Sequence, residues 1–109
     1  MVRFTVCVTA VCTNKAQQLQ QAFSYLAKNA RFEPGYQAAS ARLDGDSSVQ
    51  YEETWATEPD LMRRVRSEAF RSVLEVMESS SGEPSIQFHL AITTRGLEYV
   101  EHVRRSGST

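Results

Sequence analysis

A phenol, a carboxylate and an indole occupy three alternate positions near the middle of the chain. The stretch Tyr51-Glu52-Glu53-Thr54-Trp55 contains the only tryptophan among the 109 residues. In an extended strand, side chains two residues apart share a face, so Tyr51, Glu53 and Trp55 are predicted to line one surface. A carboxylate beside an indole on a buried surface is costly unless a partner satisfies it. The stretch is therefore either a satisfied polar group of the core or part of a ligand pocket.

If this surface is a pocket, Glu53 is the predicted general base, because a desolvated carboxyl next to an indole is suited to accept a proton near neutral pH. The alternative is a structural acceptor for backbone groups or for an arginine. Arginines 63, 64 and 66 follow closely in the sequence. Such a basic run is usually a solvated helix face, but an inward arginine, with Arg64 as our candidate, could hold a phenolate or a carboxylate.

His89 is the second candidate for proton transfer. It alternates with Ile86, Phe88 and Leu90 in a later predicted strand and should lie on the opposite face, in a dimer interface or barrel lumen. A satisfied structural histidine is the alternative. The predicted catalytic pair is thus Glu53 and His89, and the predicted substrate-binding residues are Trp55, Tyr36, Tyr51, Arg64 and Phe70. We find no metal-ligand spacing and no phosphate-binding glycine loop.

Length and composition indicate one ordinary globular domain. The net charge of −1 provides no field that would recruit nucleic acid or an anionic membrane surface. No apolar run approaches the length of a membrane span. Met1-Val2-Arg3-Phe4 begins with strand-like alternation and lacks the features of a signal peptide. We therefore expect a cytoplasmic protein.

The two cysteines, Cys7 and Cys12, lie five residues apart in one predicted strand. An odd separation places them on opposite faces, so they cannot form a disulfide with each other while the strand is intact. We expect buried free thiols.

Hydrophobic periodicity predicts the order strand, helix, strand, strand, helix, strand. Asn14 and Thr57 are the predicted N-caps of the two helical regions, and Ser67 marks a second cap or a kink. The predicted ranges are a strand over 2–12, a helix over 14–30, a hairpin of strands over 36–43 and 48–56, a helical region from 57 to 78, and a strand over 86–92. This is the ferredoxin-like βαββαβ arrangement of the α+β class, with an antiparallel sheet and both helices on one face.

The other face of such a sheet has no cover in a single chain. Cys7, Val11 and Ala91 would make it partly apolar, which favours a second copy. We expect a homodimer whose sheets join into an α+β barrel. The single domain spans 1–105, its tail over about 96–105 could contact the partner subunit, and 106–109 should be frayed.

Three motifs occur in register with these elements. They are Glu33-Pro34-Gly35-Tyr36, the stretch from Tyr51 to Trp55, and Ser67-Glu68-Ala69-Phe70. On these motifs the chain resembles the antibiotic biosynthesis monooxygenase-like family of dimeric α+β barrels, over roughly residues 2–95. The resemblance implies a cofactor-independent monooxygenase that oxidises a small phenolic, quinol or polyketide-like aromatic with molecular oxygen. It implies no cofactor, because the deprotonated substrate itself supplies the electrons.

The resemblance is incomplete in the second helical region. Relatives often carry a histidine there, whereas this chain has Arg63, Arg64 and Arg66. Haem-degrading relatives place an axial histidine four residues after the phenylalanine, where this chain has Leu74. The alternative to an enzyme is therefore a non-catalytic small-molecule-binding or stress-associated protein on the same dimeric scaffold.

Overall fold

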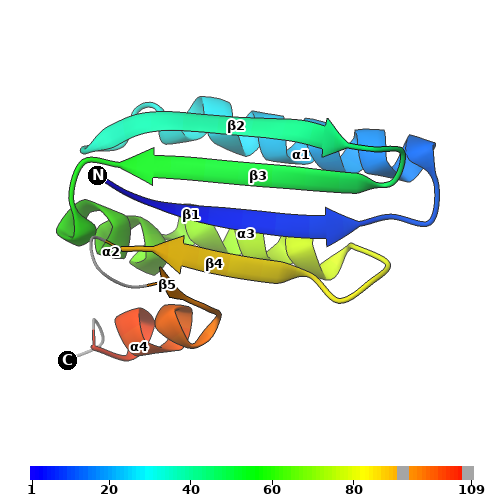
Figure 1. Ribbon diagram of the computed structural model, residues 1–109. Coiled ribbons are helices and arrows are strands. Elements are labelled where there is room, and N and C mark those ends of the chain that lie inside the picture. The colour runs from blue at the N-terminus through cyan, green and yellow to red at the C-terminus, as the bar shows by residue number, and fades with distance from the viewer. Residues whose placement is uncertain (91–93, 107–109) are drawn as a thin grey trace.

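The computed structural model describes residues 1–90 and 94–106. Figure 1 shows an antiparallel sheet with helices packed behind it. The elements in chain order are β1 (Val2–Thr9), α1 (Thr13–Ala30), β2 (Tyr36–Asp44), β3 (Ser48–Trp55), α2 (Glu58–Arg66), α3 (Glu68–Glu78), β4 (Ser85–His89), β5 (Thr94–Arg95) and α4 (Glu98–Ser106).

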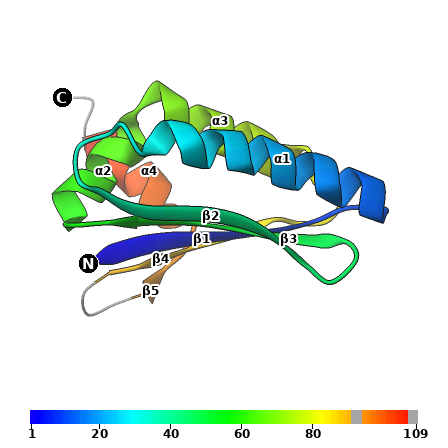
Figure 2. The same ribbon diagram turned by 90° about the horizontal axis from the view of Figure 1, so that it is seen from above.

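The strand order β2-β3-β1-β4-β5 confirms the predicted ferredoxin-like α+β fold. Every pairing is antiparallel, and the helices lie on one face of the sheet (Figure 2).

β5 and α4 were not predicted, because two residues are too few to show alternation and the apolar pattern of the C-terminal segment is short. The predicted end of the last strand, at residues 91–92, lies outside the described residues, as do residues 107–109 of the predicted frayed end. Ser106, predicted as frayed, belongs to α4.

The core lies between the sheet and the helices. β3 shows perfect alternation, with Val49, Tyr51, Glu53 and Trp55 buried and the residues between them partly exposed. Phe4 of β1 contacts the rings of Phe70 and Phe88 at centroid distances of 5.4 and 5.6 Å. The aromatic side chains of β1, β4 and α3 therefore meet in one layer.

Local signals fix the ends of some elements. Thr57 caps α2 by accepting a hydrogen bond from the Asp60 backbone N–H at 3.3 Å, as predicted. Gly35 ends the turn before β2 with a φ of +85°, and a side chain there would collide with Asp60. The predicted Asn14 cap is wrong: α1 begins at Thr13 with Cys12 as its N-cap residue, without a side-chain cap bond.

The face of the sheet away from the helices is polar, which corrects the expectation of an apolar second face. It presents the residues that alternate with the buried ones: Arg3, Thr5, Cys7 and Thr9 on β1, Gln50, Glu52 and Thr54 on β3, and Ser85, Gln87 and His89 on β4. β1 ends at Thr9, so Val11 follows the strand, and Ala91 lies outside the described residues. We call this surface the open face.

The predicted burial of the two thiols is also wrong. Cys7 lies on the open face and Cys12 at the start of α1, and both are free and exposed. The prediction failed because it assumed one strand through Cys12 and a cover over its second face.

The C-terminal segment forms α4 and packs against α2 of the same chain. Tyr99, Val100 and Val103 are buried, and the Tyr99 hydroxyl donates to Glu58 at 2.9 Å. Arg104 of α4 donates to the Val65 carbonyl, and Arg66 of α2 donates to the Val103 carbonyl, at 2.7 and 3.3 Å. Contact of this segment with a partner subunit stays a prediction.

Candidate functional site

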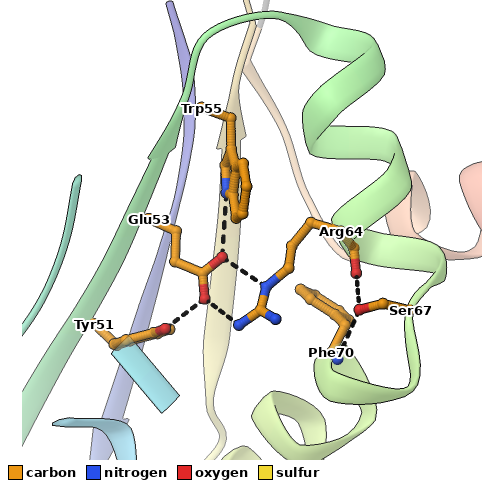
Figure 3. Close-up of polar contacts among 6 residues, drawn as sticks. All are labelled: Tyr51, Glu53, Trp55, Arg64, Ser67 and Phe70. Carbon is orange, nitrogen blue, oxygen red and sulfur yellow. Dashed lines mark hydrogen bonds and ion pairs between the residues drawn. The ribbon is translucent and has the colours of Figure 1, made fainter. Parts of the chain in front are cut away.

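The side chains of Tyr51, Glu53, Trp55 and Arg64 form one hydrogen-bonded unit, which we call the buried cluster (Figure 3). The Glu53 carboxylate accepts from the Trp55 indole N–H at 3.1 Å and from Arg64 Nε and Nη2 at 2.9 and 2.8 Å. The Tyr51 hydroxyl donates to the same carboxylate. Four donors thus hold one acceptor group, two of them in the bidentate geometry that arginine offers a carboxylate.

Two elements bring these groups together. The strand period puts Tyr51, Glu53 and Trp55 on the face of β3 that meets the helices. Arg64 comes from the last turn of α2, which stops at Ser67 with extended backbone. The Ser67 hydroxyl donates to the Arg64 carbonyl at 2.6 Å and accepts from the Phe70 backbone N–H at 3.3 Å, so it also caps α3. The second cap predicted at Ser67 is confirmed.

The buried cluster is dry. Tyr51, Glu53, Trp55 and Phe70 expose none of their surface, and Arg64 exposes 3%. The Phe23 ring stacks on Tyr51 at 4.8 Å, and Tyr36 meets the edge of Trp55 at 6.1 Å. A side chain without accessible surface has no water-sized space against it, so no aromatic ligand reaches the Glu53 carboxylate in this conformation.

The electrostatics favour one fixed protonation state. Burial, followed by the charge and hydrogen bond of Glu53, raises the pKa of Tyr51 far above its ordinary value. Burial acts to lower the pKa of Arg64, but the hydrogen bonds and charge of Glu53 outweigh burial and raise that pKa. Tyr51 therefore stays a neutral donor and Arg64 stays charged, opposite the one carboxylate. Among the described residues, no buried side-chain nitrogen or oxygen atom lacks a hydrogen-bond partner, and a satisfied buried ion pair of this kind is typical of a structural role.

The structure separates His89 from the other predicted site residues. Tyr51, Glu53, Trp55 and Arg64 are bonded together, and Tyr36 and Phe70 belong to the surrounding aromatic layer. His89 instead lies on the open face, as the alternation predicted. It borders a hollow of about 380 Å³. The residues around this hollow lie at the end of the sheet where β1 begins and β3 and β4 end, and Figure 1 shows these three strand ends side by side. The hollow is lined by Met1, Val2, Arg3, Thr54, His89 and Leu90, and we call it the open-face hollow.

Sequence reasoning missed Arg3 and Thr54 as possible partners of His89. In the sheet register, Arg3 lies opposite His89 on one side and opposite Thr54 on the other. Strand pairing between β1, β3 and β4 would have been the signal, but a single sequence does not give the register.

Hollows formed by described residues also lie among the helices. One, of about 330 Å³, lies between α1 and the end of α3, where Lys15, Leu19 and Val76 contribute to its wall. Another, of about 320 Å³, lies between α3 and α4 and includes Leu74, Met77 and Val100.

Within residues 1–90 and 94–106, no group of three or more His, Cys, Asp or Glu side chains is placed to hold a metal ion. No described helix is both long and apolar enough to cross a bilayer.

Comparison with known proteins finds no matching family model and no matching curated protein. Solved structures do match. A Deinococcus radiodurans protein, provisionally named an antibiotic biosynthesis monooxygenase, superposes with a TM-score of 0.72 at 16% identity, over 85% of this chain and 94% of that chain. SnoaB, a cofactor-independent oxygenase from Streptomyces nogalater solved as a variant, gives 0.68 at 15% identity, over 84% and 93%.

A third structure, described as an antibiotic biosynthesis monooxygenase, gives a TM-score of 0.65 at 14% identity and is covered over its whole length by 85% of this chain. At these identities the likeness concerns the fold, and activities do not transfer with it. The chain has the fold of the antibiotic biosynthesis monooxygenase-like proteins, as its three motifs indicated.

Proposed function

We propose that this protein is a homodimeric α+β barrel that binds a small aromatic ligand, and that the buried cluster supports its fold and takes no part in chemistry. The observation that carries the proposal is the saturation of Glu53. Its carboxylate accepts from four donors and has no exposed surface. A general base must come within hydrogen-bond reach of the proton it abstracts, and the side chains packed around Glu53 leave no path for a substrate.

The open face supports the dimeric part of the proposal. The helices cover only one side of the sheet (Figure 2), and the uncovered side carries small polar residues such as Thr5, Cys7 and Ser85. Small side chains allow two sheets to approach closely, and the isologous contact of a two-fold dimer would cover both at once. Light scattering is expected to give twice the chain mass of 12.3 kDa at micromolar concentration. A monomer at that concentration would contradict the dimer.

Ligand binding without oxygenation is tested with metal-free protein and a panel of hydroquinones, anthrones and simple aromatic acids. We expect ligand-dependent amide shifts in NMR spectra and no oxygen consumption above buffer. Oxygen uptake that depends on protein concentration would overturn the non-catalytic assignment.

A second candidate function is cofactor-independent oxygenation of a small phenolic or quinol. The likeness to SnoaB, itself a cofactor-independent oxygenase, favours it. In that case His89 is the proposed base, because of the two predicted catalytic residues it is the one that borders a hollow, and the deprotonated ring would reduce oxygen directly. Oxygen uptake lost in His89→Ala and kept in Glu52→Gln, a change elsewhere on the open face, would establish this function. Uptake unchanged in His89→Ala would remove His89 from it.

A further inference from the structure

We propose that the hollow between α1 and the end of α3 binds a small aliphatic carboxylate, with the chain among apolar side chains and the carboxylate at Lys15. We call this space the α1–α3 hollow. It is lined by Ala10, Val11, Lys15, Gln18, Leu19, Ala22, Val76, Ser79 and Ser81. Such a site goes beyond the proposed function, whose ligand is aromatic, and does not depend on it.

The α1–α3 hollow lies away from the surface that the proposed dimer would cover. It is formed by α1, by α3 with the loop that follows, and by the chain just after β1. The helices lie on the side of the sheet opposite the open face (Figure 2). The hollow also borders Ala10 and Val11, where β1 has ended, whereas the open-face hollow borders Met1 and Val2, where β1 begins. Two copies joined through their open faces would therefore leave the α1–α3 hollow accessible.

The lining residues of three elements face one another. Those of α1 follow one another at intervals of one, three or four residues and share one side of the helix: Lys15, Gln18, Leu19 and Ala22. Val76 and Ser79 are three residues apart and likewise share one side of α3 and its C-cap. Ala10 donates its backbone N–H to the Ser47 carbonyl at 2.7 Å, so it continues the alternation that buries Val8 beneath the helices.

The body of the hollow is aliphatic. Leu19 and Val76 form its helical walls, and Val11 exposes 77% of its surface, which a bound chain would remove from water. Ala10 and Ala22 are small and leave a space of about 330 Å³, within the range of small-ligand sites. None of the described lining residues is aromatic, so the wall has no ring on which an aromatic ligand could stack. These features favour an aliphatic chain over a ring.

The rim carries one positive charge. Lys15 is the only charged residue among the described lining residues, and within residues 1–90 and 94–106 it has no ion pair. The first turn of α1 contains no acid. Gln18, one turn further along the same side of α1, adds the donors of its amide group. An ammonium and an amide donor on one helix face together suit a carboxylate.

The loop after α3 holds the third wall in place. The backbone N–H and the hydroxyl of Ser81 both donate to the Thr9 carbonyl, at 2.9 and 3.3 Å, and a side chain at Gly82 would collide with Thr9. The Ser79 hydroxyl donates to the Glu75 carbonyl at 3.0 Å. The wall is thus tied to the end of β1, and a site formed in advance costs less ordering when a ligand binds. Because both hydroxyl protons are engaged, the donors left for a carboxylate are those of α1.

The ligand class is tested by titrating the full chain with octanoate, with its neutral analogue octanol and with benzoate, at one ionic strength. Amide and methyl resonances are followed by NMR. We expect octanoate to shift Leu19, Ala22 and Val76 and to bind about fivefold more tightly than octanol, because the charge-assisted hydrogen bonds are lost with the carboxylate. Benzoate is expected to bind more weakly than octanoate.

Two pairs of variants locate the site. Ala22→Leu fills the hollow and is expected to weaken octanoate binding about tenfold or more, whereas Ala27→Leu, at a partly buried position of α1 outside the lining, should leave it unchanged. Lys15→Gln is expected to weaken binding about fivefold, and Lys15→Arg, which keeps the charge, should restore most of it. Lys28→Gln, also exposed on α1, is the matched control. Circular dichroism verifies that each variant is folded.

Several results would overturn the inference. Equal affinity for octanoate and octanol, or equal losses in Lys15→Gln and Lys28→Gln, would remove the carboxylate role of Lys15. Benzoate binding as tightly as octanoate would remove the aliphatic ligand class. Parent-like binding by folded Ala22→Leu, octanoate shifts confined to the hollow between α3 and α4, or no octanoate binding at all would remove the site. The proposed function would survive each of these outcomes, because the aromatic panel tests it separately.

Discussion

Two groups of polar side chains lie on opposite sides of the sheet, one buried and fully hydrogen-bonded and the other partly exposed. Glu53 is wholly buried and accepts from four donors, whereas Thr54, the next residue, borders a hollow on the open face. Arg64 is held by a carboxylate, whereas Arg3 has none among the described residues. A satisfied, dry cluster contributes to stability and specificity, while groups left with unused hydrogen-bonding capacity are available to a ligand. The contrast places the satisfied polar groups on the helix side of the sheet and the unpaired ones on the open face.

Removing the arginine of the buried cluster gives the largest expected effect. Arg64→Leu leaves the Glu53 carboxylate buried without its counter-charge and is expected to destabilise the fold by roughly 3–5 kcal/mol. Urea unfolding followed by far-UV circular dichroism measures it. The control is the neighbouring Arg63→Leu, because Arg63 forms an exposed ion pair with Asp60, and solvent-exposed ion pairs contribute little to stability. Equal effects of the two variants would show that the buried cluster has no special role in stability.

Tyr51 is expected to give a smaller loss that depends on pH. Tyr51→Phe removes a hydrogen bond to a charged acceptor, at a cost of about 1.5–3 kcal/mol. Because the folded-state pKa of Tyr51 is raised, its contribution is fully present below the unfolded tyrosine pKa of about 10 and is lost as pH rises above that value.

The alkaline decline of stability should therefore be shallower in Tyr51→Phe than in the parent protein. It should not vanish, because burial and the hydrogen bond to Glu58 also raise the pKa of Tyr99. Unfolding midpoints between pH 8 and 11 measure the slopes, with Tyr25→Phe on the exposed side of α1 as the control. Identical slopes in Tyr51→Phe and the parent would contradict the assigned role of this phenol.

Replacing both charges together should be milder than replacing one. The double variant Glu53→Leu with Arg64→Leu removes the carboxylate and the guanidinium, and exchanges of this kind are often near neutral. We expect the double variant to be more stable than Arg64→Leu by about 2 kcal/mol or more, which is the coupling expected of residues in direct contact. Additive losses would mean that the two charges act independently.

The open face should show the smallest effect on stability. Thr54→Val keeps the shape of the side chain on a partly exposed strand position and is expected to change the free energy of unfolding by no more than about 0.5 kcal/mol. A large loss of stability in Thr54→Val would remove the division of roles between the two faces.

Much of the fold follows from local patterns in the sequence. The alternation from Ser48 to Trp55, the Thr57 cap and the Ser67 break all appear as predicted, because each depends on a few neighbouring residues. The buried side of the site was predictable for the same reason, since Tyr51, Glu53 and Trp55 share a face by strand period alone.

What could not be predicted depends on contacts between distant segments. Only the packing of α2 against β3 decides that Arg64, among three arginines, turns to Glu53. Arg3, Thr54 and His89 lie in one row only because of the register of three strands. The open face is polar because β1 ends at Thr9, before Val11. The short helix α4 is stabilised by α2, since Tyr99 bonds to Glu58 and Arg104 to the Val65 carbonyl, and short helices have little stability of their own.

The single tryptophan is an intrinsic fluorescent probe of the helix-covered side of the sheet. Trp55 is the only indole in the chain, lies wholly out of water and donates to the carboxylate that unites the buried cluster. Its fluorescence should be blue-shifted and inaccessible to acrylamide while the helices cover the sheet. Any opening of that layer, even brief, would appear as a quenchable, red-shifted fraction. Opening of the layer between the helices and the sheet can thus be followed without an added label.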